Sequence, residues 1–182
     1  MNDFKTVKES QVVISELMLP SHSNFNGKIH GGYILSLLDQ IAFACASKHS
    51  GKYCVTASVD TVDFLKPIEI GELVTMRASV NFVGHSSMVI GIRVEAENIQ
   101  TGQRKHCNSS YFTMVAKDQE GKSVNVPGLI LQSENEIRRF AKSIKRKDMK
   151  KKRSKEFHET DFSSHEYHDI LEQYKVQIRK NS

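Results

Sequence analysis

The chain has 182 residues, of which 38% are hydrophobic, so it is long enough for one globular domain with an appendage. Its formal net charge is +5, but nine basic residues and one acid lie between Lys142 and Lys155, so the positive charge belongs to one segment and the remainder is mildly acidic. The three cysteines, Cys45, Cys54 and Cys107, form no C-x-x-C pair, and no apolar run reaches the roughly 18 residues that a membrane helix requires. We therefore expect a cytoplasmic protein with buried free thiols, no disulfide framework, no metal site and no membrane partner.

The first predicted elements are a strand, a polar loop and a long helix. Residues 12–17 form an apolar, β-rich stretch, and Pro20 with the following SHSNFNGKIHGG predicts a loop. Residues 33–48 lack Gly and Pro and are apolar almost all round, which is typical of a helix enclosed by other elements. The polar residues of this helix form one narrow stripe: Ser36, Asp39, Gln40 and Ser47.

Four strands are predicted after the helix. They cover about residues 53–65, 72–83, 87–99 and 104–117, and the period of two is clearest in the middle pair. One face of the sheet must therefore be buried. The connections between these strands are too short for crossover helices, which predicts antiparallel pairing.

A change of composition after Gly128 predicts the end of the folded core. Residues 131–155 are predicted to form a charged helix, and residues 156–182 a weak second helix. Few apolar residues are available there for burial. The sequence therefore predicts a domain over residues 1–128 and a basic, helical extension over residues 129–182.

Asp39 is the only charged residue between Lys28 and Lys48, and it lies in the middle of the predicted apolar helix. A carboxylate on a narrow polar stripe is often the solvated edge of a helix, and the pattern favours this interpretation as strongly as a functional one. In a cleft, the same carboxylate would be placed to act as a general base. Both interpretations stay open from the pattern alone.

The segment NFNGKIHGG places two side-chain amides and three glycines just before the helix. In one interpretation Asn24 or Asn26 caps backbone groups and glycine permits the turn. In the other, Gly31 and Gly32 sit at the helix N-terminus, where unpaired N–H groups and the helix dipole form an oxyanion hole. Gly32 and Asp39 are about two helical turns apart, roughly 10 Å, so a joint site would need a second subunit or a curved path.

Other chemical motifs are weak. The eight histidines show no H-E-x-x-H or regular metal spacing, and no G-x-S-x-G elbow occurs. The turn GHSS lacks the Walker sequence; its Ser86 and Ser87 could donate to a phosphate, but a hairpin turn alone explains them. Four histidines lie in the last strand or the tail: His106, His158, His165 and His168.

The chain carries three long segments in order and at family-like spacing: NFNGKIHGGYILSLLDQIAFACASKH, VTASVDTVDFLKPIEIGELV and VGHSSMVIGIRVEAENIQTG. Over about residues 11–128 it resembles the hotdog-fold acyl-CoA thioesterases, which include YciA-type bacterial enzymes and mammalian cytosolic and mitochondrial acyl-CoA hydrolases. The resemblance implies an α+β hotdog fold, in which a curved antiparallel sheet wraps a long central helix, and hydrolysis of acyl-CoA. It also implies a homodimer, commonly assembled into a homohexamer as a trimer of dimers, and no cofactor, since CoA is part of the substrate.

The resemblance also implies roles for individual residues. Asn24 matches the active-site asparagine, Asp39 the catalytic carboxylate and Thr56 a supporting hydroxyl. The amides near Gly31 and Gly32 match the donors that polarise the thioester, and Asp39 would act either as a general base or as a nucleophile. More loosely, the family's contacts to CoA correspond to these residues: His30, Gly84, Ser86 and Ser87.

Two related functions compete with hydrolysis. A hotdog hydratase would place a histidine five positions after the catalytic aspartate, where this chain has Ala44, and this difference counts against hydration. A regulator that binds acyl-CoA without cleaving it is harder to separate. We expect no nucleic-acid partner, because the chain lacks a recognisable helix-turn-helix and a lysine-rich helix is usually a solvated extension.

Overall fold

The structure, a computed structural model of the chain, describes residues 3–162, 170–171, 173–177 and 179. The strands predicted over 12–17, 72–83 and 104–117 are confirmed at both ends. The elements are, in chain order, β1 (Phe4–Thr6), α1 (Val7–Ser10), β2 (Val12–Leu17), a short 3-10 helix (Pro20–His22), α2 (Gly31–Ser50), β3 (Tyr53–Val59), β4 (Glu72–Val83), β5 (Ser87–Asn98), β6 (Arg104–Lys117), β7 (Gly128–Ile130) and α3 (Glu134–Glu159).

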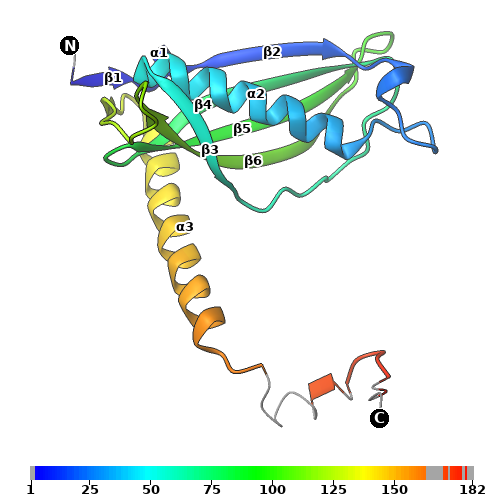
Figure 1. The fold of residues 1–182 in the computed structure, drawn as a ribbon. Helices are drawn as coiled ribbons and strands as arrows, with labels where there is room; N and C mark the ends of the chain where they lie inside the picture. Colours follow the sequence, from blue (N-terminus) through cyan, green and yellow to red (C-terminus); the bar gives the residue numbers. More distant parts are fainter. Residues whose placement is uncertain (1–2, 163–169, 172, 178, 180–182) are drawn as a thin grey trace. The chain divides into compact units, whose positions relative to one another are not determined.

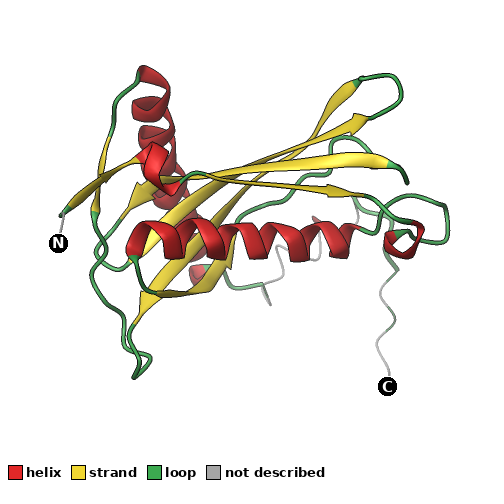
Figure 2. Ribbon diagram, turned by 90° about the horizontal axis from the view of Figure 1, so that it is seen from above, coloured by secondary structure: helices red, strands yellow, loops and turns green. Residues whose placement is uncertain are grey.

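Five strands form one antiparallel sheet in the order β2-β4-β5-β6-β3, and α2 lies along one face of it (Figure 1 and Figure 2). Short turns join β4 to β5 and β5 to β6, so these neighbours pair along almost their whole lengths. The predicted arrangement, a long helix against an antiparallel sheet, is confirmed. Because β2 and β3 are the two edge strands, each has one side without a partner in this sheet.

The core lies between α2 and the facing side of the sheet. Alternate residues of β4 and β5 are buried, as the period of two predicts, and they meet a helix whose Leu38, Ile41 and Ala42 are fully buried. Full burial of a Leu or Ile side chain contributes about 1.5–3 kcal/mol. This contact therefore fixes α2 on the sheet and determines which of its side chains remain outside.

The three cysteines are free and buried, as predicted. Burial raises the pKa of the Cys45 thiol to about 12 and also raises that of Cys107. These two thiols therefore stay protonated near neutral pH and pack as small apolar side chains.

Four elements differ from their predicted ranges: β5 ends one residue early, α3 covers Glu134–Glu159 instead of 131–155, and the differences are larger for α2 and β3. The helix α2 begins at Gly31 and continues to Ser50, where Gly51 adopts a left-handed conformation (φ 66°) and donates its N–H to Ser47 O (2.8 Å). The strand β3 ends at Val59 instead of residue 65, and a bulge between Thr56 and Ser58 shifts its pairing with β6.

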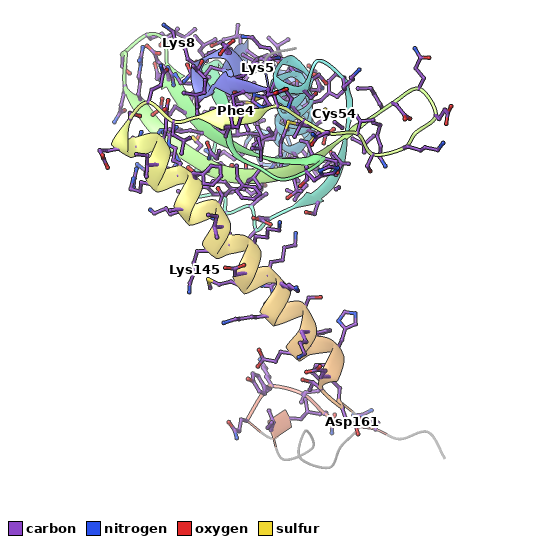
Figure 3. All side chains as sticks on the ribbon, turned by 90° about the vertical axis from the view of Figure 1, so that its left-hand side faces the viewer. Phe4, Lys5, Lys8, Cys54, Lys145 and Asp161 are labelled. Atoms are coloured by element: carbon purple, nitrogen blue, oxygen red, sulfur yellow. The ribbon has the colours of Figure 1, made fainter. Side chains whose placement is uncertain are left out.

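A small layer joins the N-terminus to the segment before α3. There β1 and β7 pair in parallel. Phe4, labelled in Figure 3, packs so closely on Gly128 that a Cβ there would lie 2.4 Å from its ring. Lys5 Nζ donates to His49 O (2.6 Å), which ties this layer to the end of α2.

The C-terminal part of the chain contains the long helix α3, along which nitrogen-tipped side chains project (Figure 3). The chain divides into two compact units, Met1–Ser143 and Ile144–Ser182, so this division falls inside α3. Of the second helix predicted over 156–182, the residues up to Glu159 belong to α3, and 163–169, 172, 178 and 180–182 lie outside the described residues. Among the described residues after Glu159, only 170–171 are helical. In the described parts of the chain, no helix is long and apolar enough to cross a membrane.

We expect a chain that ends at Ser143 to fold and a chain that ends at Gly128 to be less stable. The longer form keeps β7, the Phe82–Phe140 ring contact (5.0 Å) and the buried Ser143. Loss of a packed phenylalanine costs about 3–5 kcal/mol, so urea unfolding should separate the two forms by roughly this amount. Equal stability would instead support the domain boundary predicted at residue 128.

Candidate active site

Asn24 lies in the loop before α2, and its side chain organises the turn there. Its Oδ1 accepts hydrogen bonds from the backbone N–H groups of Asn26 (2.9 Å) and Lys28 (3.2 Å). The N–H of Asn24 in turn donates to Lys28 O (2.7 Å). The turn therefore occupies the carboxamide oxygen, and the exposed NH2 group remains available as a donor.

An aromatic and carboxylate cluster fixes this loop against α2. The ring of His22 stacks on Tyr33 with 3.9 Å between ring centroids, and His22 O accepts from His30 N–H (2.8 Å). The Tyr33 hydroxyl donates to Glu16 on β2, and this hydrogen bond raises the pKa of Tyr33. Sequence analysis missed the cluster, because no local pattern links Glu16 to Tyr33.

The first turn of α2 presents one free backbone donor. His30 is the N-cap, and its Nδ1 accepts from Gly32 N–H (3.1 Å). Gly31, at the first helical position, has no partner for its N–H inside the helix. Of the two amides predicted as free donors, Gly32 is therefore engaged in a cap, and Gly31 keeps the position at the positive end of the helix dipole.

Asp39 lies on the exposed side of α2, two turns further along the helix. Its Oδ1 accepts a hydrogen bond of 2.5 Å from Thr56 Oγ1 on β3, and Thr56 Oγ1 also lies 3.3 Å from Met114 Sδ. The fold of a single chain thus brings together two of the predicted site residues from different elements. The bond fixes the orientation of an otherwise exposed carboxylate.

An open depression of about 530 Å³ adjoins the Asp39–Thr56 pair. Gln40 belongs to the polar stripe noted in the sequence, and Thr56 was a predicted site residue. The other lining residues from β3 and β6 were not predicted from the sequence as part of the site. Phe43 and Tyr53 form one wall, with an edge-to-face contact of 5.8 Å between ring centroids. The remaining lining residues are Gln40, Cys54, Val55 and Met114.

The predicted CoA-contacting residues lie in two other places. His30 caps α2, while Gly84 and Ser86 lie in the β4–β5 turn and Ser87 begins β5; Gly84 N–H donates to Ser87 O (2.7 Å). None of the four lines the depression beside Asp39. Within the described part of the chain, no group of three or more His, Cys, Asp and Glu residues could hold a metal ion.

Apolar side chains on α2 and β3 surround the exposed Asp39. Leu35, Phe43 and Val59 are about two-fifths exposed, and Tyr53 is 62% exposed. They lie beside the unpaired edge of β3. An exposed apolar patch next to a free strand edge is typical of a surface that another chain covers.

Comparison with known proteins identifies relatives of the whole folded region. A family model described as Thioesterase superfamily matches residues 26–103. Protein VdlD of Helicobacter pylori is 43% identical over 145 residues, which cover 80% of this chain and 83% of that protein. The uncharacterized acyl-CoA thioester hydrolase YkhA of Bacillus subtilis is 37% identical and covers 81% of this chain and 86% of its own length.

Solved structures have the same fold. A hexameric acyl-CoA thioesterase superposes with a TM-score of 0.81 at 36% identity, covering 83% of this chain and 97% of that one. An acyl-CoA hydrolase of Staphylococcus aureus, solved with butyryl-CoA and CoA, superposes with a TM-score of 0.78 at 32% identity, covering 85% and 94%. These matches confirm the predicted hotdog fold.

The hydrogen bonds of Asn24 predict different effects of two substitutions on stability. Asn24→Ala removes an acceptor of two backbone N–H groups and should lower the free energy of unfolding by about 1 kcal/mol. Asn24→Asp keeps an oxygen at the acceptor position and removes only the NH2 donor, so it should cost clearly less. Thermal and urea unfolding of the two variants would test this; equal losses would show that the turn does not depend on the acceptor.

Proposed function

The chain belongs to the thioesterase superfamily, and we propose that it is an acyl-CoA thioesterase, which hydrolyses acyl-CoA to a free carboxylic acid and CoA. The observation that carries this proposal is the Asp39–Thr56 hydrogen bond beside an open depression. The names of its relatives support the substrate class. The S. aureus hydrolase has also been solved with single aspartate, asparagine and threonine residues changed to alanine, and these are the residue types of Asp39, Asn24 and Thr56.

Thioester hydrolysis requires donors for an oxyanion and a group that activates water or attacks directly. Addition to the carbonyl carbon places negative charge on the carbonyl oxygen, and collapse then breaks the C–S bond and releases the CoA thiolate. The Gly31 N–H at the positive end of α2 and the NH2 group of Asn24 are suited to this oxyanion. Removal of one such donor typically costs about 10²- to 10³-fold in kcat.

Asp39 supplies the remaining group in either of two mechanisms. As a general base it takes a proton from the attacking water, and as a nucleophile it forms a transient mixed anhydride that water then cleaves. In both, the hydroxyl of Thr56 holds one carboxylate oxygen and leaves the other for chemistry. Thr56 is therefore a positioning residue.

We further propose that two chains complete each site. From Gly31 to Asp39 the helix rises by about 12 Å, whereas attacker and carbonyl carbon must approach to about 3–3.5 Å. Antiparallel packing of two α2 helices would bring Gly31 and Asn24 of one chain opposite Asp39 of the other. The twofold axis would then pass near the exposed Leu35, and the apolar patch around Asp39 would be buried.

The proposal also includes the oligomeric state of the protein, the residues that contact CoA and the compartment in which the enzyme acts. Hexameric neighbours support a trimer of dimers for this chain. His30, Gly84, Ser86 and Ser87 are proposed to contact the pantetheine and phosphates of CoA across subunits, with no cofactor involved. We place the enzyme in the cytoplasm, where its buried thiols would stay reduced.

A binding-only acyl-CoA regulator is the alternative, and one assay separates the two functions. Purified protein should release free thiol from at least part of a panel of acyl-CoAs from acetyl to palmitoyl. A sample that binds these esters and releases no thiol from any of them would favour the regulator. The same panel would define the preferred acyl chain length.

Asp39→Asn should reduce turnover by about 10²- to 10⁴-fold, because it removes the base or nucleophile and keeps the size of the side chain. Thr56→Val should reduce turnover less, since it leaves the carboxylate in place but unfixed. Asp118→Asn, in an exposed turn of the same domain, is the matched control and should keep wild-type turnover. A folded Asp39→Asn protein with near-normal thiol release would exclude the catalytic role of Asp39.

Mixing two inactive variants tests the shared site. Asn24→Ala and Asp39→Ala homodimers should each be nearly inactive, whereas a hybrid dimer would hold one site with both defects and one with neither. Random assortment makes about half of the dimers hybrids, so activity should recover to about a quarter of wild type. If subunit exchange is demonstrated and the mixture stays inactive, Asn24 and Asp39 must act within one chain.

A further inference from the structure

A groove of about 430 Å³ lies on the face of the sheet opposite α2, away from Asp39 and Thr56. Its floor comes from β4, β5 and β6, and its wall from the first turns of α3. The side chains alternate along these strands, so the residues next to the buried core positions face this groove. The Phe82–Phe140 ring contact and the buried Ser143 hold this part of α3 on the sheet.

The floor of the groove contains a polar group held in a fixed position. Asn81 is only 7% exposed, and Ser79 Oγ donates to its Oδ1 (3.2 Å). The amide fits because the facing residue on β5 is Gly91, where a Cβ would lie 2.1 Å from Asn81 Nδ2. Ser79 thus engages Asn81 Oδ1, while Asn81 Nδ2 lies beside Gly91 on the lining of the groove.

Basic side chains form the walls. Arg77 and Arg93 share the carboxylate of Glu95 (2.5 and 3.0 Å), and hydrogen bonding to Arg93, followed by the charges of both arginines, lowers the pKa of Glu95. Arg139 and Lys142 on α3 pair with no carboxylate in the described part of the chain. The carboxylate of Glu95 therefore balances only part of the positive charge of the basic side chains that line the groove. The fifth basic residue lining the groove is Arg138.

We propose that this groove is a second ligand site, separate from the acyl-CoA site, and that it binds a phosphate or diphosphate group of a small molecule. Guanidinium groups and a buried amide donate to phosphate oxygens in the geometry that such anions prefer. The volume falls in the usual range of about 300–1,000 Å³ for small-molecule sites. The groove lies on the opposite face of the sheet from Asp39, so its ligand would not compete with the thioester.

Inorganic diphosphate is the probe, and isothermal titration of the full chain in phosphate-free buffer at about 0.15 M ionic strength, where the Debye length is about 8 Å, is the measurement. Wild-type protein should bind it. The double variant Arg139→Gln with Lys142→Gln should bind at least about tenfold more weakly, because it removes two charged donors. Asn81→Asp should weaken binding similarly, because it places a negative charge on the groove floor and keeps the acceptor for Ser79.

The matched control is Lys151→Gln with Lys152→Gln, which removes the same charge from exposed positions further along α3. It should leave the affinity within about twofold of wild type, since exposed charges farther than a Debye length are largely screened. An equal loss in the control would assign binding to the general charge of the helix and overturn the proposal.

Three further outcomes would also overturn it. Wild-type protein that binds no diphosphate lacks the site. Loss of diphosphate binding when CoA saturates the protein would show that the anion occupies the acyl-CoA site. A change of assembly state in the groove variants by light scattering, without diphosphate binding to wild type, would make the groove a contact between copies of this chain.

Discussion

The hydrogen bond from Thr56 to Asp39 joins the two elements on which the candidate site depends, the helix α2 and the edge strand β3. The core fixes this geometry, because Leu38, Ile41 and the other buried side chains of α2 leave Asp39 on the side that the sheet does not cover. The left-handed turn at Gly51 then returns the chain so that β3 runs back along the helix. A polar pair is therefore held beside an apolar wall without being buried by its own chain.

The same geometry leaves the site incomplete in a single chain. The free N–H at Gly31 and the NH2 group of Asn24 lie near the start of α2, and the rigid helix keeps them away from Asp39. Exposed apolar side chains and the free edge of β3 surround Asp39, where a second copy would supply both sheet pairing and the missing donors. Assembly and chemistry would then depend on one surface.

The opposite face of the sheet has a different chemical character. There Gly91 leaves space for the Asn81 amide, and the early turns of α3 add positive charge above it. The basic residues counted from the sequence are thus divided between two settings: Lys142 lines the groove, and most of the others follow it along the exposed remainder of α3. Net charge alone would not have distinguished a groove from a solvated helix.

The sequence by itself determined the helix α2, the strands β2, β4, β5 and β6, and their faces, but not the short elements β1, α1 and β7. The period of two in β4 and β5, the apolar length of α2 and the isolated charge at Asp39 are local patterns, and local patterns follow from the geometry of strands and helices. The sequence also drew attention to Asn24 and the glycines before α2.

Only the tertiary structure decided that Thr56 meets Asp39, that the turn uses Asn24 Oδ1 and that His30 occupies Gly32 N–H. It also brought Asn81 of β4, Arg93 of β5 and Arg139 of α3 to one groove. Such contacts depend on strand register and on helix packing against the sheet, which join residues too far apart in the chain for any periodicity to relate them.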